Sequence, residues 1–192
     1  MGKTIFISAG HSDSDPGAVS AAGLREEDLA RDLRNAIRSE LIALGSEPLT
    51  DGDNSQNQPL TEAVKIARRN SKGINIEIHF NAGPPTASGI EALCYSNHKA
   101  LSQAVCLAIA EITKTKVRGD HGWKPSDSGQ HARLAFCEAG GIILEVEFIS
   151  NTQALTVYRR NVPAIAKSVA AVLHQASGAG SLVPKPMELV KK

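Results

Sequence analysis

Two short apolar runs, each leading to a histidine, constrain the fold of this chain more than any other feature. The first run, Thr4 to Ile7, indicates a buried strand and continues into Gly10-His11. The second, Ile74 to Ile78, continues directly into His79. Because ligand sites of open α/β sheets lie at the carboxyl ends of the strands, both imidazoles are predicted at one edge of one sheet.

A carboxylate is predicted to join the two histidines. A turn-rich loop over residues 12–17 is followed by residues 23–26, Gly-Leu-Arg-Glu, which open a long helix with apolar positions every three or four residues. Glu26 therefore lies in the first turn of that helix. Two neutral histidines and an ionised carboxylate make a catalytic zinc site when a further position is left to water. The sequence therefore offers His11, Glu26 and His79 as ligands of one zinc ion.

Four motifs in a fixed order carry a family resemblance. They are Gly10-His11, the Gly-x-x-Glu of residues 23–26, the Ile-His-x-Asn-Ala of residues 78–82 and the Leu-Glu-x-x-Phe-Ile-Ser-Asn of residues 144–151. Together they resemble the zinc-dependent N-acetylmuramoyl-L-alanine amidases of the amidase-3 family, including phage endolysins, and four ordered motifs are far more specific than one. The resemblance implies a peptidoglycan hydrolase that cleaves the amide between N-acetylmuramic acid and L-alanine of the stem peptide.

Glu145 is the candidate for proton transfer. The apolar run of residues 142–144 predicts a buried strand that brings this carboxylate to the same rim as the histidines, and the resemblance also points to it as the catalytic glutamate. A carboxylate near the metal can take a proton from the attacking water and give one to the leaving amine. Glu147 stands where the family usually has glycine, and strand alternation places it on the same face. Two close carboxylates would raise the pKa of one of them, so the identity of the general acid stays open, with Glu145 favoured by its register in the motif.

Two further departures from the family pattern surround the predicted ligands. Ser12 and Asp13 follow the first histidine in place of the usual two glycines, so Asp13 or Asp15 could approach the metal. Glu77 replaces the small polar residue commonly found two positions before the second histidine. These changes indicate a divergent branch and leave all three proposed ligands in place.

The alternation of strands and helices predicts a single α/β domain with a mostly parallel central sheet of about six strands flanked by helices. The resemblance implies the same fold. Further strands are expected over 47–50, 90–95, 132–137 and 141–146, and helices over 60–71, 101–112, 151–160 and 162–173, the last with Pro163 in its first turn. Residues 51–59 form a loop too rich in Asp, Asn and Gln to pack, and 117–131 form a long loop. We expect a catalytic domain over 1–176 and a loosely ordered tail over 177–192.

Charge and cysteine content limit the partners. The net charge is +1 with both signs scattered, which gives no electrostatic case for nucleic acid or an anionic membrane surface. Cys94, Cys106 and Cys137 have no CxxC spacing, which indicates reduced core thiols. Neither a signal peptide nor a membrane span is evident, so we expect synthesis in the cytoplasm and action on the wall after release, as in phage or prophage lysis. The sequence fixes neither the oligomeric state nor the substrate-binding residues.

Two rival functions stay open. A zinc peptidase or deacetylase on the same scaffold would hydrolyse a different amide. A degenerate, non-catalytic amidase domain would bind wall fragments without turnover. Retention of Glu145 beside all three ligands argues against the second rival, whereas Glu147 in place of glycine keeps it open.

Overall fold

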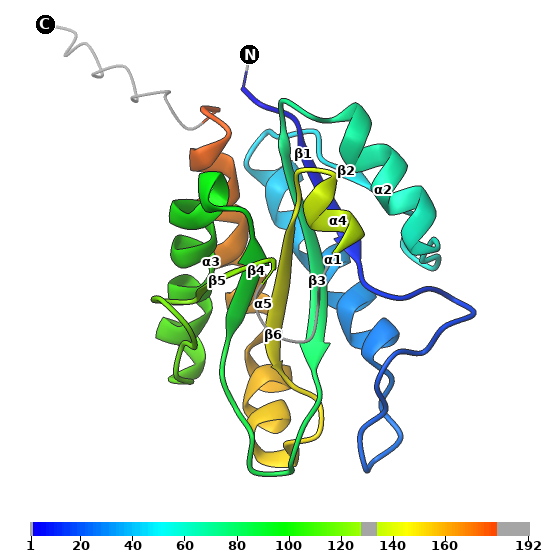
Figure 1. Ribbon diagram of the computed structural model, residues 1–192, viewed down its shortest axis with the longest axis vertical. Helices are drawn as coiled ribbons and strands as arrows, with labels where there is room; N and C mark the ends of the chain where they lie inside the picture. Colours follow the sequence, from blue (N-terminus) through cyan, green and yellow to red (C-terminus); the bar gives the residue numbers. More distant parts are fainter. Residues whose placement is uncertain (1, 128–133, 180–192) are drawn as a thin grey trace, which may run out of the picture.

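A six-stranded sheet forms the centre of the molecule (Figure 1). The computed structural model describes residues 2–127 and 134–179. The strands are β1 (Ile5–Ala9), β2 (Leu49–Thr50), β3 (Ile74–Asn81), β4 (Glu91–Cys94), β5 (Trp123–Pro125) and β6 (Ile142–Phe148). Their order is β2-β1-β3-β6-β4-β5, and within the described residues the strand pairs are parallel except β4 with β6. The predicted single α/β domain with a mostly parallel sheet is confirmed.

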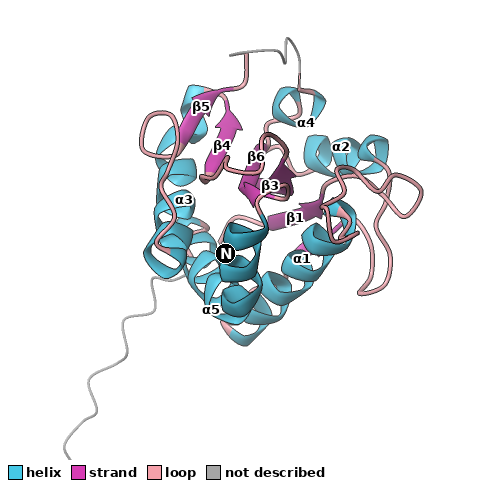
Figure 2. Cartoon of the chain, turned by 90° about the horizontal axis from the view of Figure 1, so that it is seen from below, coloured by secondary structure: helices cyan, strands magenta, loops and turns pink. Residues whose placement is uncertain are grey.

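Helices cover both faces of the sheet (Figure 2). The helices are α1 (Glu26–Ala43), α2 (Leu60–Arg69), α3 (Lys99–Thr113), α4 (Ala135–Glu138) and α5 (Thr152–Ala176), with a short 3₁₀ turn over Ser96–His98. One face packs against α1, α3 and α5 in the larger apolar core, and the other packs against α2 and α4 in a smaller one. Alternation along β1 serves both cores, because Ile5 and Ile7 enter the larger and Phe6 the smaller.

The central strand β3 shows why the functional side chains gather on one face. Ile74, Ile76 and Ile78 enter the larger core. The residues between them, including Glu77, and then His79 therefore point to the face covered by α2 and α4. A strand buried on both faces usually carries apolar residues throughout. The buried Glu77 departs from this pattern, and its carboxylate contacts His79.

The region before β6 differs from the prediction of a strand over 132–137. Residues 132 and 133 lie outside the described part of the chain, and Ala135–Glu138 form the short helix α4. Phe136 and Cys137 are consecutive and both enter the smaller core, which a helical turn permits and strand alternation does not. Phe136 packs on Phe6 with ring centroids 6.2 Å apart.

The predicted long loop 117–131 contains an unpredicted strand, and its residues 128–131 lie outside the described part. Trp123–Pro125, β5, pairs with β4 at the sheet edge. Three residues are too few to show an alternating pattern in the sequence.

The two helices predicted over 151–160 and 162–173 are one helix, α5, with Pro163 inside it. Proline removes one backbone hydrogen bond, but apolar packing continues on both sides of it through Leu155, Tyr158, Ile165 and Ala166. Tertiary packing therefore outweighs the local break.

The start of the chain is hydrogen-bonded to the end of α5. After α5, the amide of Lys3 donates to the carbonyl of Ser177 at 2.7 Å, and most of the predicted tail, residues 180–192, lies outside the described residues. Cys94, Cys106 and Cys137 are free and buried. Across residues 2–127 and 134–179, no helix combines the length and apolar character needed to cross a membrane.

Candidate metal centre

His11, Glu26 and His79 converge as predicted. Glu26 Oε2 lies 3.0 Å from His11 Nε2, and Glu26 Oε1 lies 3.0 Å from His79 Nδ1. The two imidazole rings are 5.2 Å apart at an interplanar angle of 70°. One ligand atom from each residue falls within 4.8 Å of the others. The first residue of α1 therefore faces the ends of β1 and β3.

Two glycines leave the space that the rings occupy. A Cβ built on Gly10 would lie 2.3 Å from His79 Cε1, and one on Gly17 would lie 2.5 Å from His11 Nε2. Gly17 also has a positive φ of 63°, a conformation that L side chains rarely adopt. His11 itself has a φ of 67°, so the chain turns sharply where it presents the imidazole. Larger residues at either glycine would displace a predicted ligand.

The pKa shifts of Glu26, His11 and His79 favour the presence of a positive charge at the centre. Burial opposes ionisation of Glu26, but hydrogen bonds from His11, His79 and the amide of Phe80 hold its pKa below the ordinary value. The hydrogen bond to Glu26 raises the pKa of His11. For His79, burial lowers the pKa, but Glu26 and Glu77 more than reverse this and raise it. Without metal the cluster attracts protons, for which a metal ion would compete.

Glu145 lies beside this cluster. It pairs in register with His79 across β3 and β6, and it lines a cavity of about 350 Å³ together with the three predicted ligands. Its Oε2 is buried with no hydrogen-bond partner among the described residues. Burial raises the pKa of Glu145 to about 7; His79 opposes the shift, and the carboxylates of Glu26 and Glu91 add to it. A carboxyl group that titrates near neutrality can both accept and donate a proton.

Glu147 lies two residues after Glu145 on β6 but has other partners. The amides of Gly89 and Phe148 each donate to Glu147 Oε1 at 2.9 Å, and the Ser88 hydroxyl donates to Oε2 at 3.3 Å. The carboxylates that raise the pKa of Glu145 are those of Glu26 and Glu91, not the neighbour that the sequence indicated. The Glu147 carboxylate is thus hydrogen-bonded mainly to backbone amides.

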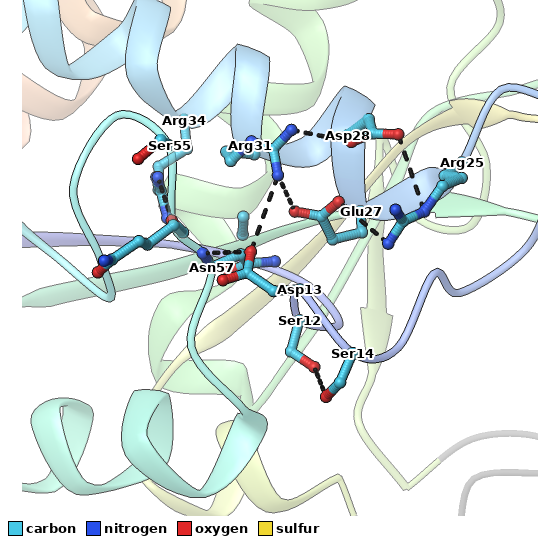
Figure 3. Close-up of polar contacts among 12 residues, drawn as sticks. Ser12, Asp13, Ser14, Arg25, Glu27, Asp28, Arg31, Arg34, Ser55 and Asn57 are labelled. Atoms are coloured by element: carbon cyan, nitrogen blue, oxygen red, sulfur yellow. Dashed lines mark hydrogen bonds and ion pairs between the residues drawn. The ribbon is translucent and has the colours of Figure 1, made fainter.

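The acidic residues near the first histidine separate into two roles. Asp15 Oδ2 lies 3.1 Å from His11 Nδ1, behind the ring as seen from Glu26. Asp13 turns away: it accepts a hydrogen bond from the amide of Asn57 at 2.9 Å and lies 3.8 Å from Arg31 (Figure 3). Arg31 in turn pairs with Glu27 in the first turn of α1, which ties the loop to the helix that carries Glu26.

The polar segment 51–59 packs more closely than predicted, at Asp51 and Asn57. Asn57 Nδ2 donates to the carbonyl of Gly10 at 3.0 Å, next to the first histidine. Asp51 accepts from the Ser8 hydroxyl at 3.0 Å and pairs with the fully buried Arg34 at 2.8 Å. Sequence reasoning missed this support, although an arginine next to the apolar stripe of α1 was a signal for it.

The residues present fit a zinc ion. Two imidazole nitrogens and a carboxylate oxygen are ligands that zinc prefers in catalytic sites. Gly10 and Gly17 leave room for both rings, and Glu145, whose Oε2 has no partner in the described part of the chain, lines the same cavity. A second cavity of about 540 Å³ adjoins the histidines and is walled by apolar residues of α2, α4 and β6, including Leu60, Phe136 and Ile143. The centre is thus accessible to a substrate.

Comparison with known proteins gives a consistent picture. Residues 5–175 match the Amidase_3 family, described as N-acetylmuramoyl-L-alanine amidase. Among curated proteins, the uncharacterized YqiI of Bacillus subtilis is 28% identical over 156 residues, covering 79% of this chain and 72% of that protein. The N-acetylmuramoyl-L-alanine amidase LytC of Bacillus subtilis is 26% identical over 157 residues, which are 79% of this chain but 30% of LytC.

Solved structures share the fold. A protein from Neisseria meningitidis, described as a proposed N-acetylmuramoyl-L-alanine amidase, superposes with a TM-score of 0.83 at 42% identity, covering 92% of this chain and 96% of that one. The catalytic domain of CwlV from Bacillus (Paenibacillus) polymyxa superposes with a TM-score of 0.73 at 22% identity, covering 90% and 97%. At that identity the second likeness shows the fold alone.

Proposed function

This chain belongs to the N-acetylmuramoyl-L-alanine amidase family, and we propose that it is a zinc-dependent peptidoglycan hydrolase. Its substrate is the amide between the lactyl group of N-acetylmuramic acid and L-alanine of the stem peptide. His11, Glu26 and His79 are the proposed metal ligands, and Glu145 is the proposed general base and acid. The observation that carries the proposal is the convergence of these three residues in one cavity beside Glu145, whose Oε2 has no hydrogen-bond partner among the described residues.

The proposed reaction is a hydrolysis in which Glu145 moves the proton. When bound, zinc would polarise the amide carbonyl and acidify a water molecule. Glu145 takes a proton from the attacking water as its oxygen bonds to the carbonyl carbon, and delivers it to the amide nitrogen as the C–N bond breaks. The products are a lactyl carboxylic acid on the glycan and a stem peptide with a free L-alanine amino group.

The position of Glu145 supports this role over Glu147. A base must reach the water and the leaving nitrogen, and the Glu145 side chain lines the cavity shared with the ligands. The Glu147 carboxylate is held by the amides of Gly89 and Phe148. A glutamine at 147 can still accept those hydrogen bonds, so Glu147→Gln is a matched control for Glu145→Gln.

The test uses purified bacterial sacculi with turbidity loss and product mass spectrometry. Wild type, chelated protein and zinc-restored protein are compared with the two glutamine variants. We expect cleavage to require zinc, to fall about 10²–10⁴-fold in Glu145→Gln and to persist in Glu147→Gln. The mass spectrum should show free stem peptides with a new L-alanine amino terminus.

Each rival function has its own outcome in that test. Zinc binding without any wall product would favour the non-catalytic binding module. Zinc-dependent cleavage at a different amide, or loss of acetyl groups, would favour the peptidase or the deacetylase. Loss of activity in Glu147→Gln with retention in Glu145→Gln would reverse the two proposed roles.

The second part of the proposal concerns where the enzyme acts. We propose that the protein is made in the cytoplasm and reaches the wall after release through a membrane lesion, in phage or prophage host lysis. Inducible expression in bacterial cells, alone and together with a membrane-permeabilising protein, tests it. Lysis should require both proteins, and lysis or wall turnover by the amidase alone would overturn the proposed role.

A further inference from the structure

Each histidine of the proposed centre has a second carboxylate behind it, and the two carboxylates differ in burial. His11 Nδ1 lies 3.1 Å from Asp15 Oδ2, whose side chain is 63% exposed. His79 Nε2 lies 3.1 Å from Glu77 Oε2, whose side chain is 3% exposed. Among the described residues, His79 is the one hydrogen-bond partner of the Glu77 carboxylate. Glu77 therefore has a buried charge directed at a single atom.

We propose that Glu77 is a positioning residue for the metal centre. Its carboxylate accepts a hydrogen bond from the Nε2–H of His79. This leaves Nδ1, which donates to Glu26 in the metal-free protein, as the nitrogen that binds the metal when the metal replaces its proton. This inference rests on the proposed function, because it assigns a support to one of the proposed zinc ligands.

Tautomer chemistry gives the reason. A neutral imidazole carries one proton, and only the nitrogen without it can bind a metal. His79 Nδ1 lies 3.0 Å from Glu26 Oε1, on the side where the proposed ligands converge, and Nε2 lies 3.1 Å from Glu77 Oε2. When a metal replaces the Nδ1 proton, the proton that the neutral ring keeps is the one on Nε2. Carboxylates behind metal-binding histidines fix the tautomer, orient the ring and increase its basicity. His11 presents the opposite nitrogen, Nε2, to Glu26.

The surroundings of Glu77 make its hydrogen bond stronger than that of Asp15. The Glu77 side chain is 3% exposed and the Asp15 side chain 63%, so fewer water dipoles screen the charge of Glu77. The His79 ring also lies against Gly10, which limits its freedom to rotate away. Asp15 competes with solvent, so its support of His11 is weaker.

The test is zinc affinity, measured by competition with a chromogenic chelator in the absence of peptidoglycan. We expect zinc to bind about 10–100-fold more weakly to Glu77→Gln than to wild type. Asp15→Asn should weaken binding less than Glu77→Gln does, and Glu147→Gln, which removes another buried carboxylate of the sheet, should leave it unchanged. Affinity of Glu77→Gln within twofold of wild type would overturn the inference.

A second measurement needs no variant and so does not depend on the folding of Glu77→Gln. Long-range ¹H–¹⁵N spectra of the zinc-loaded wild-type protein should show the His79 proton on Nε2 and the His11 proton on Nδ1. A proton on His79 Nδ1 would overturn the assignment. A wild type that binds no zinc would defeat both this inference and the proposed function, whereas a zinc-binding protein that leaves sacculi intact would defeat only the catalytic proposal.

Discussion

Buried charges occur in two neighbouring regions of this molecule, and only one of these regions is balanced by opposite charge within residues 2–127 and 134–179. At the junction of α1 with residues 51–57, the Arg34 guanidinium donates to Asp51 Oδ1 at 2.8 Å and to the carbonyls of Asp53 and Gln56 at 2.6 and 2.8 Å. Asp51 also accepts from the Ser8 hydroxyl. This junction has a cation at its centre.

The metal centre has the opposite arrangement. Glu26, Glu77 and Glu145 form no ion pair with lysine or arginine in the described part of the chain, and Glu145 Oε2 has no hydrogen-bond partner there. The histidines supply partial compensation only when protonated. Three acidic groups around two imidazoles therefore leave a deficit of positive charge.

The difference separates structural charge from functional charge. A buried ion pair with complete hydrogen bonding needs nothing from outside, whereas breaking it leaves an uncompensated charge. An unbalanced cluster costs stability and persists where a ligand uses it. The comparison predicts that removing one charge lowers the free energy of unfolding in the balanced region and raises it in the unbalanced one.

Removal of the cation from the balanced junction should have the largest effect. Arg34→Met leaves the buried Asp51 carboxylate without its partner, and we expect a loss of about 3–5 kcal/mol in the free energy of unfolding. Urea denaturation followed by circular dichroism measures it. Arg38→Met, one turn later on α1, is the control and should change stability by about 0.5 kcal/mol or less. A loss below about 1 kcal/mol in Arg34→Met would show that the junction does not depend on this pair.

Removal of a charge from the unbalanced centre should stabilise the metal-free protein at high pH. Burial raises the pKa of Glu145 to about 7 from its ordinary value of 4.5. The folded protein therefore binds more protons than the unfolded chain between these values, and this group costs stability increasingly as pH rises through that window. Glu145→Gln removes the cost.

Urea denaturation of chelated protein at pH 5 and pH 8 measures this effect. The stability of Glu145→Gln relative to wild type should rise by about 2 kcal/mol between the two pH values. Parallel pH dependence in the two proteins would mean that the Glu145 carboxylate is compensated in the folded state, which would remove the contrast between the regions.

Sequence reasoning located the parts of the fold whose signals are local. The apolar runs of β1, β3 and β6 and the helical stripe of α1 are strong, and the three proposed ligands and Glu145 lie in or next to these elements. Convergence then follows from strand polarity. The continuity of α5 through Pro163 and the helical turn at α4 were not predictable in this way, because tertiary packing decides both.

The supports of the site were harder to predict than its ligands. Glu77 was visible as a departure from the family pattern, but only the structure places its carboxylate 3.1 Å from His79 Nε2. Asp51 and Asn57 lie in a segment whose composition is typical of an unpacked loop, yet both are buried. Their burial depends on a partner 17 residues away for Asp51 and 47 away for Asn57, and no local pattern records such pairings.

Substitution of glycine by alanine should have the smallest effect on stability, and at Gly17 it tests how the centre holds the His11 ring. Gly17 and Gly45 have φ values of 63° and 83°, so Gly17→Ala and Gly45→Ala should each cost about 1 kcal/mol of backbone strain. A Cβ at Gly45 meets nothing within 4 Å, whereas one at Gly17 would lie 2.5 Å from His11 Nε2 and 2.8 Å from Glu26 Oε2. We therefore expect zinc affinity to fall about tenfold or more in Gly17→Ala alone, because strain common to both variants cancels in the comparison. Equal zinc affinities would mean that His11 can move aside without weakening zinc binding. Gly17 would then not be needed to hold the His11 ring in place.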